Sequence, residues 1–123
     1  MHLGSVLLSI QSLLCNNPLH NEPGFENEVG SRNDLYNLVV EYDNYNHLIK
    51  KNGFEIHPLF ESMNDIIKHH LRKEKKNILK KMNSLAKKHS KPAKISLNIY
   101  NIVMPINYPH LKAELSEKFD KLE

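Results

Sequence analysis

The sequence predicts a mainly α-helical protein with three main helices and a short C-terminal helix. Two observations predict this fold class, and a third limits the predicted extended structure to one short segment. Apolar residues recur at spacings of three and four in four separate segments, which is the pattern of amphipathic helices. Proline, glycine and asparagine lie between these segments, where they favour turns and end helices. Apolar and polar residues alternate, as in a strand, over the short segment 95–99.

The first predicted helix covers Leu3 to Leu14 and ends at Asn16-Asn17-Pro18. Its apolar residues occupy a wide face, so we expect other parts of a protein to cover it on more than one side. The segment is as apolar as a signal peptide, but it lacks a basic start and a small-residue cleavage site, and we place it in the mature fold. A loop follows as far as Arg32, with Phe25 as its expected anchor.

The second predicted helix starts near residues 31–34, where a Ser or Asn side chain is expected to cap it, and it closes at Asn52-Gly53. The third helix begins at Pro58, a residue favoured at the first helical position, with His57 as a cap-like residue before it. Lys91-Pro92 marks its end.

The apolar stripe of the third helix weakens at Glu74 and Lys75, which allows a bend or a solvated middle there. Beyond Pro92 we expect an extended segment, although Ile102, Val103 and Met104 break the alternation of a strand. A final short helix is predicted from His110 to Leu122, where apolar residues again follow the helical period.

Length and composition exclude several classes of protein. With 123 residues and 14.3 kDa, the chain has the size of one domain. Cys15 is the single cysteine, so these residues can form no internal disulfide and no cysteine-based zinc site. The longest apolar run, Val6 to Ile10, is too short to cross a bilayer, which takes about 20 residues. The sequence therefore predicts neither a membrane helix nor a disulfide-stabilised fold.

Nearly all the positive charge lies in one segment. Residues 1–67 contain three basic and nine acidic residues, a formal charge of −6. Residues 68–94 contain eleven basic residues and one acidic residue, a formal charge of +10, and residues 95–123 contribute −1. Any interaction with an acidic partner is therefore expected to involve residues 68–94.

That segment places a basic face opposite the apolar stripe of the third helix. Its candidate members are Lys68, Arg72, Lys75, Lys76, Lys80 and Lys81. Such a face can bind phosphates or an acidic protein, and it can equally be a solvated helix surface. The segment contains no Phe, Tyr or Trp for base stacking, so we expect no sequence-specific binding of nucleic acid.

The histidines and the cysteine form no catalytic or metal-binding pattern. None of the eight histidines pairs with another at the four-residue spacing of a helical metal site, and no HExxH motif occurs. Cys15 has no Lys, Arg or second Cys beside it in the sequence, and its closest candidate base is His20, across Pro18. It is interpreted as an inert thiol. Glycine-rich phosphate loops are absent as well. The sequence predicts no catalytic residue, no metal and no cofactor.

Two neighbouring stretches, Ser5 to Leu14 and Asn17 to Glu26, together resemble the ubiquitin-conjugating enzymes. Ser5 to Leu14 is similar to the helix that follows the active site in that family. The next stretch, Asn17-Pro18-Leu19-His20-Asn21-Glu22-Pro23-Gly24-Phe25-Glu26, is similar to the ENPYHNEPGFE loop of the Z-type members. The joint pattern is far more specific than either stretch alone. The helices expected at 33–51 and 58–88 match by position the last two long helices of the family.

The resemblance implies that residues 1–90 are the C-terminal helical part of the α+β ubiquitin-conjugating (UBC) fold, and that residues 91–123 are a C-terminal extension. It implies that His20, Asn21 and Glu22 border the active-site cleft. In the family, the sheet, the His-Pro-Asn motif and the thioester-forming cysteine precede the segment that Ser5 begins here. Cys15 matches a packing position instead. We therefore expect this chain to be inactive alone.

Three functional interpretations remain open. In the first, the resemblance implies a Z-type UBC-family protein whose complete form transfers ubiquitin or a ubiquitin-like modifier through a cysteine thioester. Its partners would be ubiquitin-pathway proteins in the cytoplasm and nucleus. In the second, the chain is a non-catalytic helical module that binds another protein. In the third, it is a basic helical protein that binds an acidic partner. No membrane partner is expected in any of them.

Overall fold

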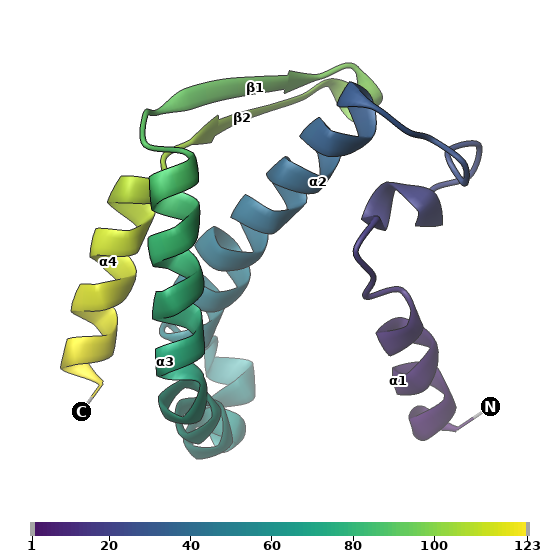
Figure 1. The fold of residues 1–123 in the computed structure, drawn as a ribbon. Coiled ribbons are helices and arrows are strands. Elements are labelled where there is room, and N and C mark those ends of the chain that lie inside the picture. The colour runs from purple at the N-terminus through teal and green to yellow at the C-terminus, as the bar shows by residue number, and fades with distance from the viewer. Residues whose placement is uncertain (1, 123) are drawn as a thin grey trace.

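The computed structural model describes residues 2–122. The predicted divisions 1–90 and 91–123 each include one residue outside this range, Met1 and Glu123. Helices and one two-stranded sheet make up the fold (Figure 1). In chain order the elements are α1 (Leu3–Ser12), η1 (Pro18–Asn21), α2 (Ser31–Asp43), η2 (Asn44–Gly53), η3 (Pro58–Met63), α3 (Asn64–Lys88), β1 (Ala93–Leu97), η4 (Ile99–Asn101), β2 (Ile102–Ile106) and α4 (Tyr108–Lys121). The predicted mainly α-helical class is confirmed.

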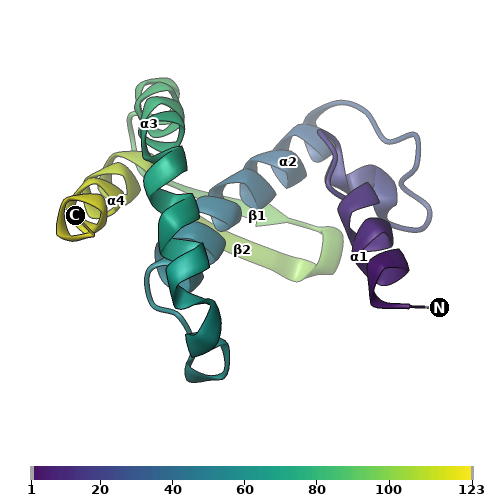
Figure 2. The same cartoon turned by 90° about the horizontal axis from the view of Figure 1, so that it is seen from below.

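The first helix forms as predicted but stands apart from the body of the molecule. Figures 1 and 2 show α1 on the side of the fold away from α3 and α4. None of its residues is buried. Leu8 is 68% exposed, and Leu14, just beyond the helix, is 79% exposed. The apolar face that the sequence predicts is therefore uncovered by the described residues.

The loop between α1 and α2 is anchored by a different residue from the one predicted. Phe25 is half-buried, and the Arg32 guanidinium lies 5.7 Å from the centre of its ring. Leu19 is the residue that is fully buried, in the short 3-10 helix η1, which packs on α2. Leu19 was missed because a single apolar residue between polar neighbours carries no periodic signal.

The second predicted helix has the expected extent but two departures in detail. Its N-cap is Gly30, with φ of 84° and no capping side chain, so the predicted Ser or Asn cap is wrong. Glycine adopts this positive φ angle without steric cost, so the chain turns into α2 at Gly30, one residue before the predicted cap region. Beyond Asp43 the helix widens into a π-helix, η2, and it ends at Gly53.

The third predicted helix is divided at its start. Pro58–Met63 forms the 3-10 helix η3, because Phe60 has non-helical angles (φ −110°, ψ 16°), and α3 begins at Asn64. The cap-like role of His57 is confirmed, since its Nδ1 accepts a hydrogen bond from the backbone N–H of Leu59 at 3.2 Å. Glu74 and Lys75 do not interrupt the helix, because α3 is one continuous helix of 25 residues.

The extended segment after Pro92 is an antiparallel hairpin. β1 pairs with β2, with Ala93 opposite Ile106 and Leu97 opposite Ile102. β2 was not predicted as a strand because its apolar residues do not alternate with polar ones. Burial does alternate along it: Ile106 is buried, whereas Val103 and Pro105 are exposed. A strand on a small two-stranded sheet can leave apolar side chains in solvent, which hides its period in the sequence.

One hydrophobic core joins α2, α3, the hairpin and α4. Its buried members are Val39, Tyr42, Met82, Leu85, Leu97, Ile106, Tyr108, Leu111 and Leu115. The final helix starts at Tyr108, two residues earlier than predicted, because the Asn107 side chain accepts a hydrogen bond from the N–H of His110 at 3.1 Å and caps it. Among the described residues, no helix is both long and apolar enough to span a bilayer.

Candidate functional site

The loop that carries His20, Asn21 and Glu22 is held in place by their side chains. His20 Nε2 lies 2.8 Å from the backbone carbonyl oxygen of Glu28, which assigns the proton to Nε2 because a carbonyl can only accept. Asn21 Nδ2 donates to the carbonyl of Leu13 at 2.9 Å and lies 3.5 Å from Cys15 Sγ. These two residues therefore fold the loop onto itself and onto the end of α1.

Glu22 connects parts of the chain that are far apart in sequence. Its Oε2 accepts a hydrogen bond from the Tyr100 hydroxyl at 2.7 Å, and its Oε1 accepts one from the Tyr36 hydroxyl at 3.4 Å. The hydrogen bond to Glu22 raises the pKa of Tyr100, and burial followed by the Glu22 charge raises the pKa of Tyr36. Glu22 thus ties η1 to α2 and to the tip of the hairpin.

Asn17 completes this loop site, and sequence reasoning missed it. Its Oδ1 accepts hydrogen bonds from Nδ2 of Asn33 at 3.3 Å and from Nδ2 of Asn37 at 3.1 Å. These two asparagines lie on one face of α2, four residues apart. The bonds join the start of η1 to the first turns of α2. No local pattern could have indicated them, because the partners are 16 and 20 residues away.

The chemistry available at this loop is that of a structured binding surface. Cys15 is exposed and has an amide beside it rather than a base. His20 and Asn21 donate to backbone carbonyls, and the Glu22 carboxylate accepts from two tyrosine hydroxyls. Over residues 2–122, no group of three or more His, Cys, Asp and Glu side chains is arranged to hold a metal ion. A rigid loop with fixed polar groups can orient a protein partner.

The predicted basic residues differ in their surroundings on α3. Lys75 and Lys81 lie at the flanks, where Lys75 Nζ is 3.8 Å from Asp120 of α4 and Lys81 Nζ is 3.1 Å from Glu41 of α2. The Glu41 carboxylate raises the pKa of Lys81. Lys76 and Lys80 are exposed. Lys68, nearer the start of α3, is half-buried.

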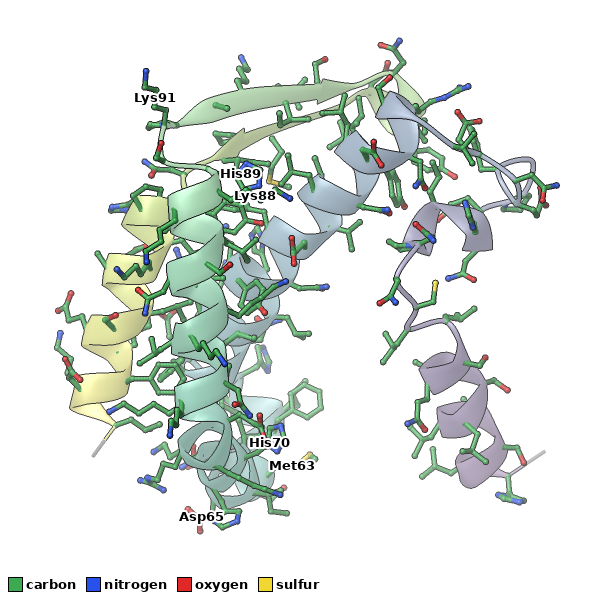
Figure 3. The ribbon with its side chains drawn as sticks, viewed as in Figure 1. Met63, Asp65, His70, Lys88, His89 and Lys91 are labelled. Atoms are coloured by element: carbon green, nitrogen blue, oxygen red, sulfur yellow. The ribbon has the colours of Figure 1, made fainter. Side chains whose placement is uncertain are left out.

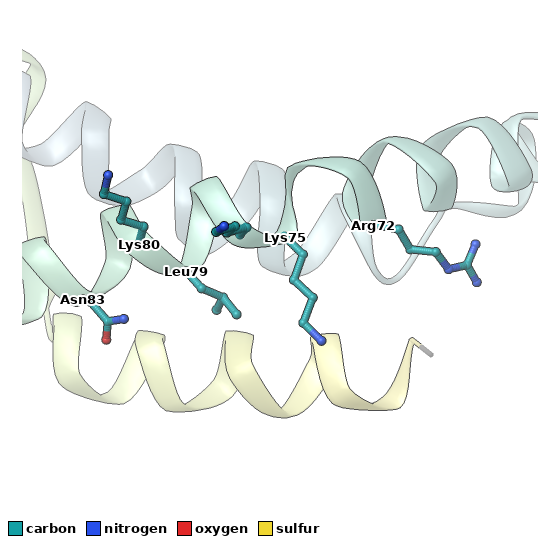
Figure 4. A pocket seen from close by; sticks show the side chains of 6 residues that line it. Arg72, Lys75, Leu79, Lys80 and Asn83 are labelled. Carbon is teal, nitrogen blue, oxygen red and sulfur yellow. The ribbon is translucent and has the colours of Figure 1, made fainter.

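An open groove of about 530 Å³ follows α3, and four of the predicted basic residues contribute to it. Its lining consists of Arg72, Lys75, Lys76, Leu79, Lys80 and Asn83 (Figure 4). Lys75, Leu79 and Asn83 point toward α4, whereas Lys80 points away from it. Arg72 also donates from Nη2 to the backbone carbonyl of Leu122 at 3.1 Å. The groove is cationic but has no enclosed pocket for a small molecule.

Fold and site together define a mainly helical protein with a structured loop, an uncovered apolar helix and a basic helix. Part of the chain is similar to curated proteins named Ubiquitin-conjugating enzyme E2 Z. The Xenopus tropicalis protein is 52% identical over 42 residues, which are 33% of this chain and 13% of that protein. The Danio rerio and Homo sapiens proteins are each 69% identical over 26 residues, which are 21% of this chain and 8% and 7% of those proteins.

The matched segments therefore span about a tenth of the length of these relatives. They indicate a partial relationship to the ubiquitin-conjugating enzyme family. No family model matches the chain. No solved structure matches it either.

Proposed function

We propose that this chain acts in the conjugation of ubiquitin or a ubiquitin-like modifier, as a Z-type-like protein of the UBC family. The observation that supports it is the 52% identity over 42 residues to the Xenopus tropicalis Ubiquitin-conjugating enzyme E2 Z. The joint resemblance of Ser5 to Leu14 and of the loop after Asn17 agrees with that match. The proposed sites of action are the cytoplasm and the nucleus.

In this proposal, residues 1–123 bind partners and do not form the thioester. Nucleophilic attack needs a thiolate, and thiolates in proteins are stabilised by a neighbouring cation, base or helix N-terminus. Cys15 lies beyond the C-terminal end of α1, and the Asn21 amide donates to its sulfur at 3.5 Å. His20, Asn21 and Glu22 would border the cleft of a complete enzyme, where they would help to orient an incoming lysine.

A thioester assay tests the catalytic part of the proposal. Residues 1–123 and the Cys15→Ser variant are each incubated with ubiquitin, its activating enzyme and ATP, and are resolved without reducing agent. We expect no thiol-sensitive ubiquitin adduct on either protein. An adduct on the unaltered chain that disappears in Cys15→Ser would show that Cys15 is a nucleophile and would contradict the proposal.

The pathway itself is tested on the endogenous protein, captured with an antibody to the Lys68–Lys94 region. Its intact mass is measured, and the captured protein enters the same thioester assay. Its partners are identified separately, after chemical cross-linking in cells. A mass above 14.3 kDa with thioester formation supports the proposal. A 14.3 kDa product that cross-links to no ubiquitin-pathway protein contradicts it.

The second candidate function is a helical interaction module outside catalysis, and the uncovered face of α1 favours it. Leu3, Leu7 and Ile10 are exposed, and no charged residue precedes Glu22 in the chain. An apolar surface of this kind is typical of protein interaction sites. Partner-dependent protection of the α1 amides from hydrogen exchange, without any thioester in the captured complex, would favour this candidate over the first.

A further inference from the structure

Four lysines lie in one line along the outer side of α3. We define this basic stripe as Lys73, Lys76, Lys80 and Lys87. With a helical repeat of about 100° per residue, the four fall within a sector of about 60°, directly opposite the buried residues Leu71, Met82 and Leu85. All four are exposed. Lys73 and Lys87 extend the predicted basic face toward both ends of the helix.

The stripe is left open while the lysines beside it are neutralised. Lys75 on one flank pairs with Asp120 of α4, and Lys81 on the other flank pairs with Glu41 of α2. None of the four stripe lysines has an ion pair within residues 2–122. The neighbouring helices therefore supply carboxylates to the flanks of α3 and none to its outer side.

We propose that the basic stripe is a docking surface for an acidic helix of another protein. The lysines are separated by three, four and seven residues, which are one, one and two helical turns, so a helix with Glu or Asp at the same spacing would place a carboxylate opposite each lysine. The pairs with Asp120 and Glu41 show that lysines of α3 form ion pairs with carboxylates of the helices packed beside it. A partner helix on the outer side would repeat that arrangement. This inference does not depend on the proposed role in conjugation.

Two other anionic partners fit the surface less well. Nucleic-acid phosphates are best matched by arginine forks, but Arg72 is the one arginine on α3 and its guanidinium already donates to Leu122. No Phe, Tyr or Trp lies on α3 to stack on a base. A membrane-binding helix needs an apolar face toward the lipid, whereas Leu71, Met82 and Leu85 of α3 are buried in the protein.

The test compares one stripe variant with a matched control on the full chain. The stripe variant is Lys73→Gln, Lys76→Gln, Lys80→Gln and Lys87→Gln. The control is Lys51→Gln, Lys88→Gln, Lys91→Gln and Lys94→Gln, which removes the same charge from exposed lysines outside the stripe. The probe is a synthetic helical peptide with glutamates at three- and four-residue spacing on one face. A permuted peptide of the same composition and a duplex RNA are compared with it by fluorescence anisotropy.

At an ionic strength of about 0.15 M, we expect the patterned peptide to bind the unaltered chain more tightly than the permuted peptide or the RNA. The stripe variant should bind the patterned peptide about tenfold more weakly, because four exposed ion pairs are lost, and the control should change little. Both variants should keep the circular dichroism and melting temperature of the unaltered chain. Equal losses in the two variants, equal binding of the two peptides, tighter binding of RNA, or no peptide binding would overturn the proposal.

Discussion

At the scale of single residues, the Glu22 carboxylate links two segments that are far apart in the sequence. It lies in a part of the chain with no regular strand or long helix, yet it accepts hydrogen bonds from Tyr36 on α2 and Tyr100 near the hairpin tip. Tyr100 and Asn101 both have positive φ angles, 58° and 51°, in the turn that joins the strands. The contact to Glu22 holds Tyr100 in a backbone conformation that is uncommon for a bulky residue, whereas Asn adopts it more readily.

The first prediction concerns this contact. Because the Glu22 carboxylate stabilises the protonated Tyr100 hydroxyl, Glu22→Gln should lower the pKa of Tyr100 toward its ordinary value. Tyr100 is resolved by nuclear magnetic resonance titration of ring-labelled tyrosine, with Tyr100→Phe assigning the signal. An unchanged Tyr100 titration in Glu22→Gln would show that the two side chains do not interact in solution.

Tyr108 provides the second prediction, because its ring and its hydroxyl have opposite effects on stability. The ring is fully buried, edge-on to Tyr42 at 5.1 Å and stacked on His89 at 5.3 Å. The hydroxyl is buried without a hydrogen-bond partner among the described residues. Tyr108→Phe should therefore leave the free energy of unfolding equal or higher, whereas Tyr108→Ala should lower it by about 3–5 kcal/mol.

The same residue predicts the alkaline limit of stability. Burial, and then the Glu41 charge, raises the pKa of Tyr108 in the folded chain well above its value of 10.0 in a model peptide. The unfolded chain ionises first, so the free energy of unfolding should fall as the pH rises above about 10. Urea unfolding between pH 8 and pH 11 should show this fall, and Tyr108→Phe should reduce it. An identical pH dependence in both proteins would contradict the assignment.

At the scale of elements, the same leucine-rich pattern has two different outcomes. Leu7 of α1 is 56% exposed, whereas Leu115 of α4 is fully buried. Both belong to amphipathic helices, but α4 has neighbours that cover its apolar face: α3 along its length and η2, with the hairpin in the same core (Figure 3). His89 and Lys88 mark the end of α3 near the hairpin, and Met63 marks the opposite end.

A matched pair of substitutions tests this difference. Leu7→Ala should change the free energy of unfolding by no more than about 0.5 kcal/mol, because it removes no buried contact. Leu115→Ala removes the same atoms from the core and should cost about 2–5 kcal/mol. Urea denaturation of the two variants gives both values. A large loss for Leu7→Ala would show that α1 is covered in solution, for example by a second copy of the chain.

At the scale of the whole molecule, one core crosses the predicted division at residue 90. Met82 and Leu85 on α3 pack with Leu97, Ile106 and Leu111, which all follow it. The assignment of residues 1–90 to a UBC core and 91–123 to an extension stays a prediction about family relationship. In packing terms the hairpin and α4 cover the apolar faces of α2 and α3.

Truncation provides the fifth prediction. A chain ending at residue 90 lacks five of the nine buried core residues, namely Leu97, Ile106, Tyr108, Leu111 and Leu115. It should retain helical circular dichroism but lose the sharp urea transition of the full chain, because the remaining apolar faces have nothing to pack against. A cooperative transition at the same midpoint would show that residues 91–123 are dispensable for the core.

The helical periods, the stops between helices, the basic segment and the cap at His57 could be predicted from the sequence, because these features depend on residues within a few positions of one another. The sequence also carried the loop on which the family resemblance rests. Tertiary structure alone decided that Leu19 is the anchor, that Val103 and Pro105 belong to a strand, and that Glu22 meets Tyr100. It decided which lysines of α3 are neutralised, since Asp120 and Glu41 come from other helices. Contacts between residues far apart in the chain depend on how the helices pack, and no local pattern encodes them.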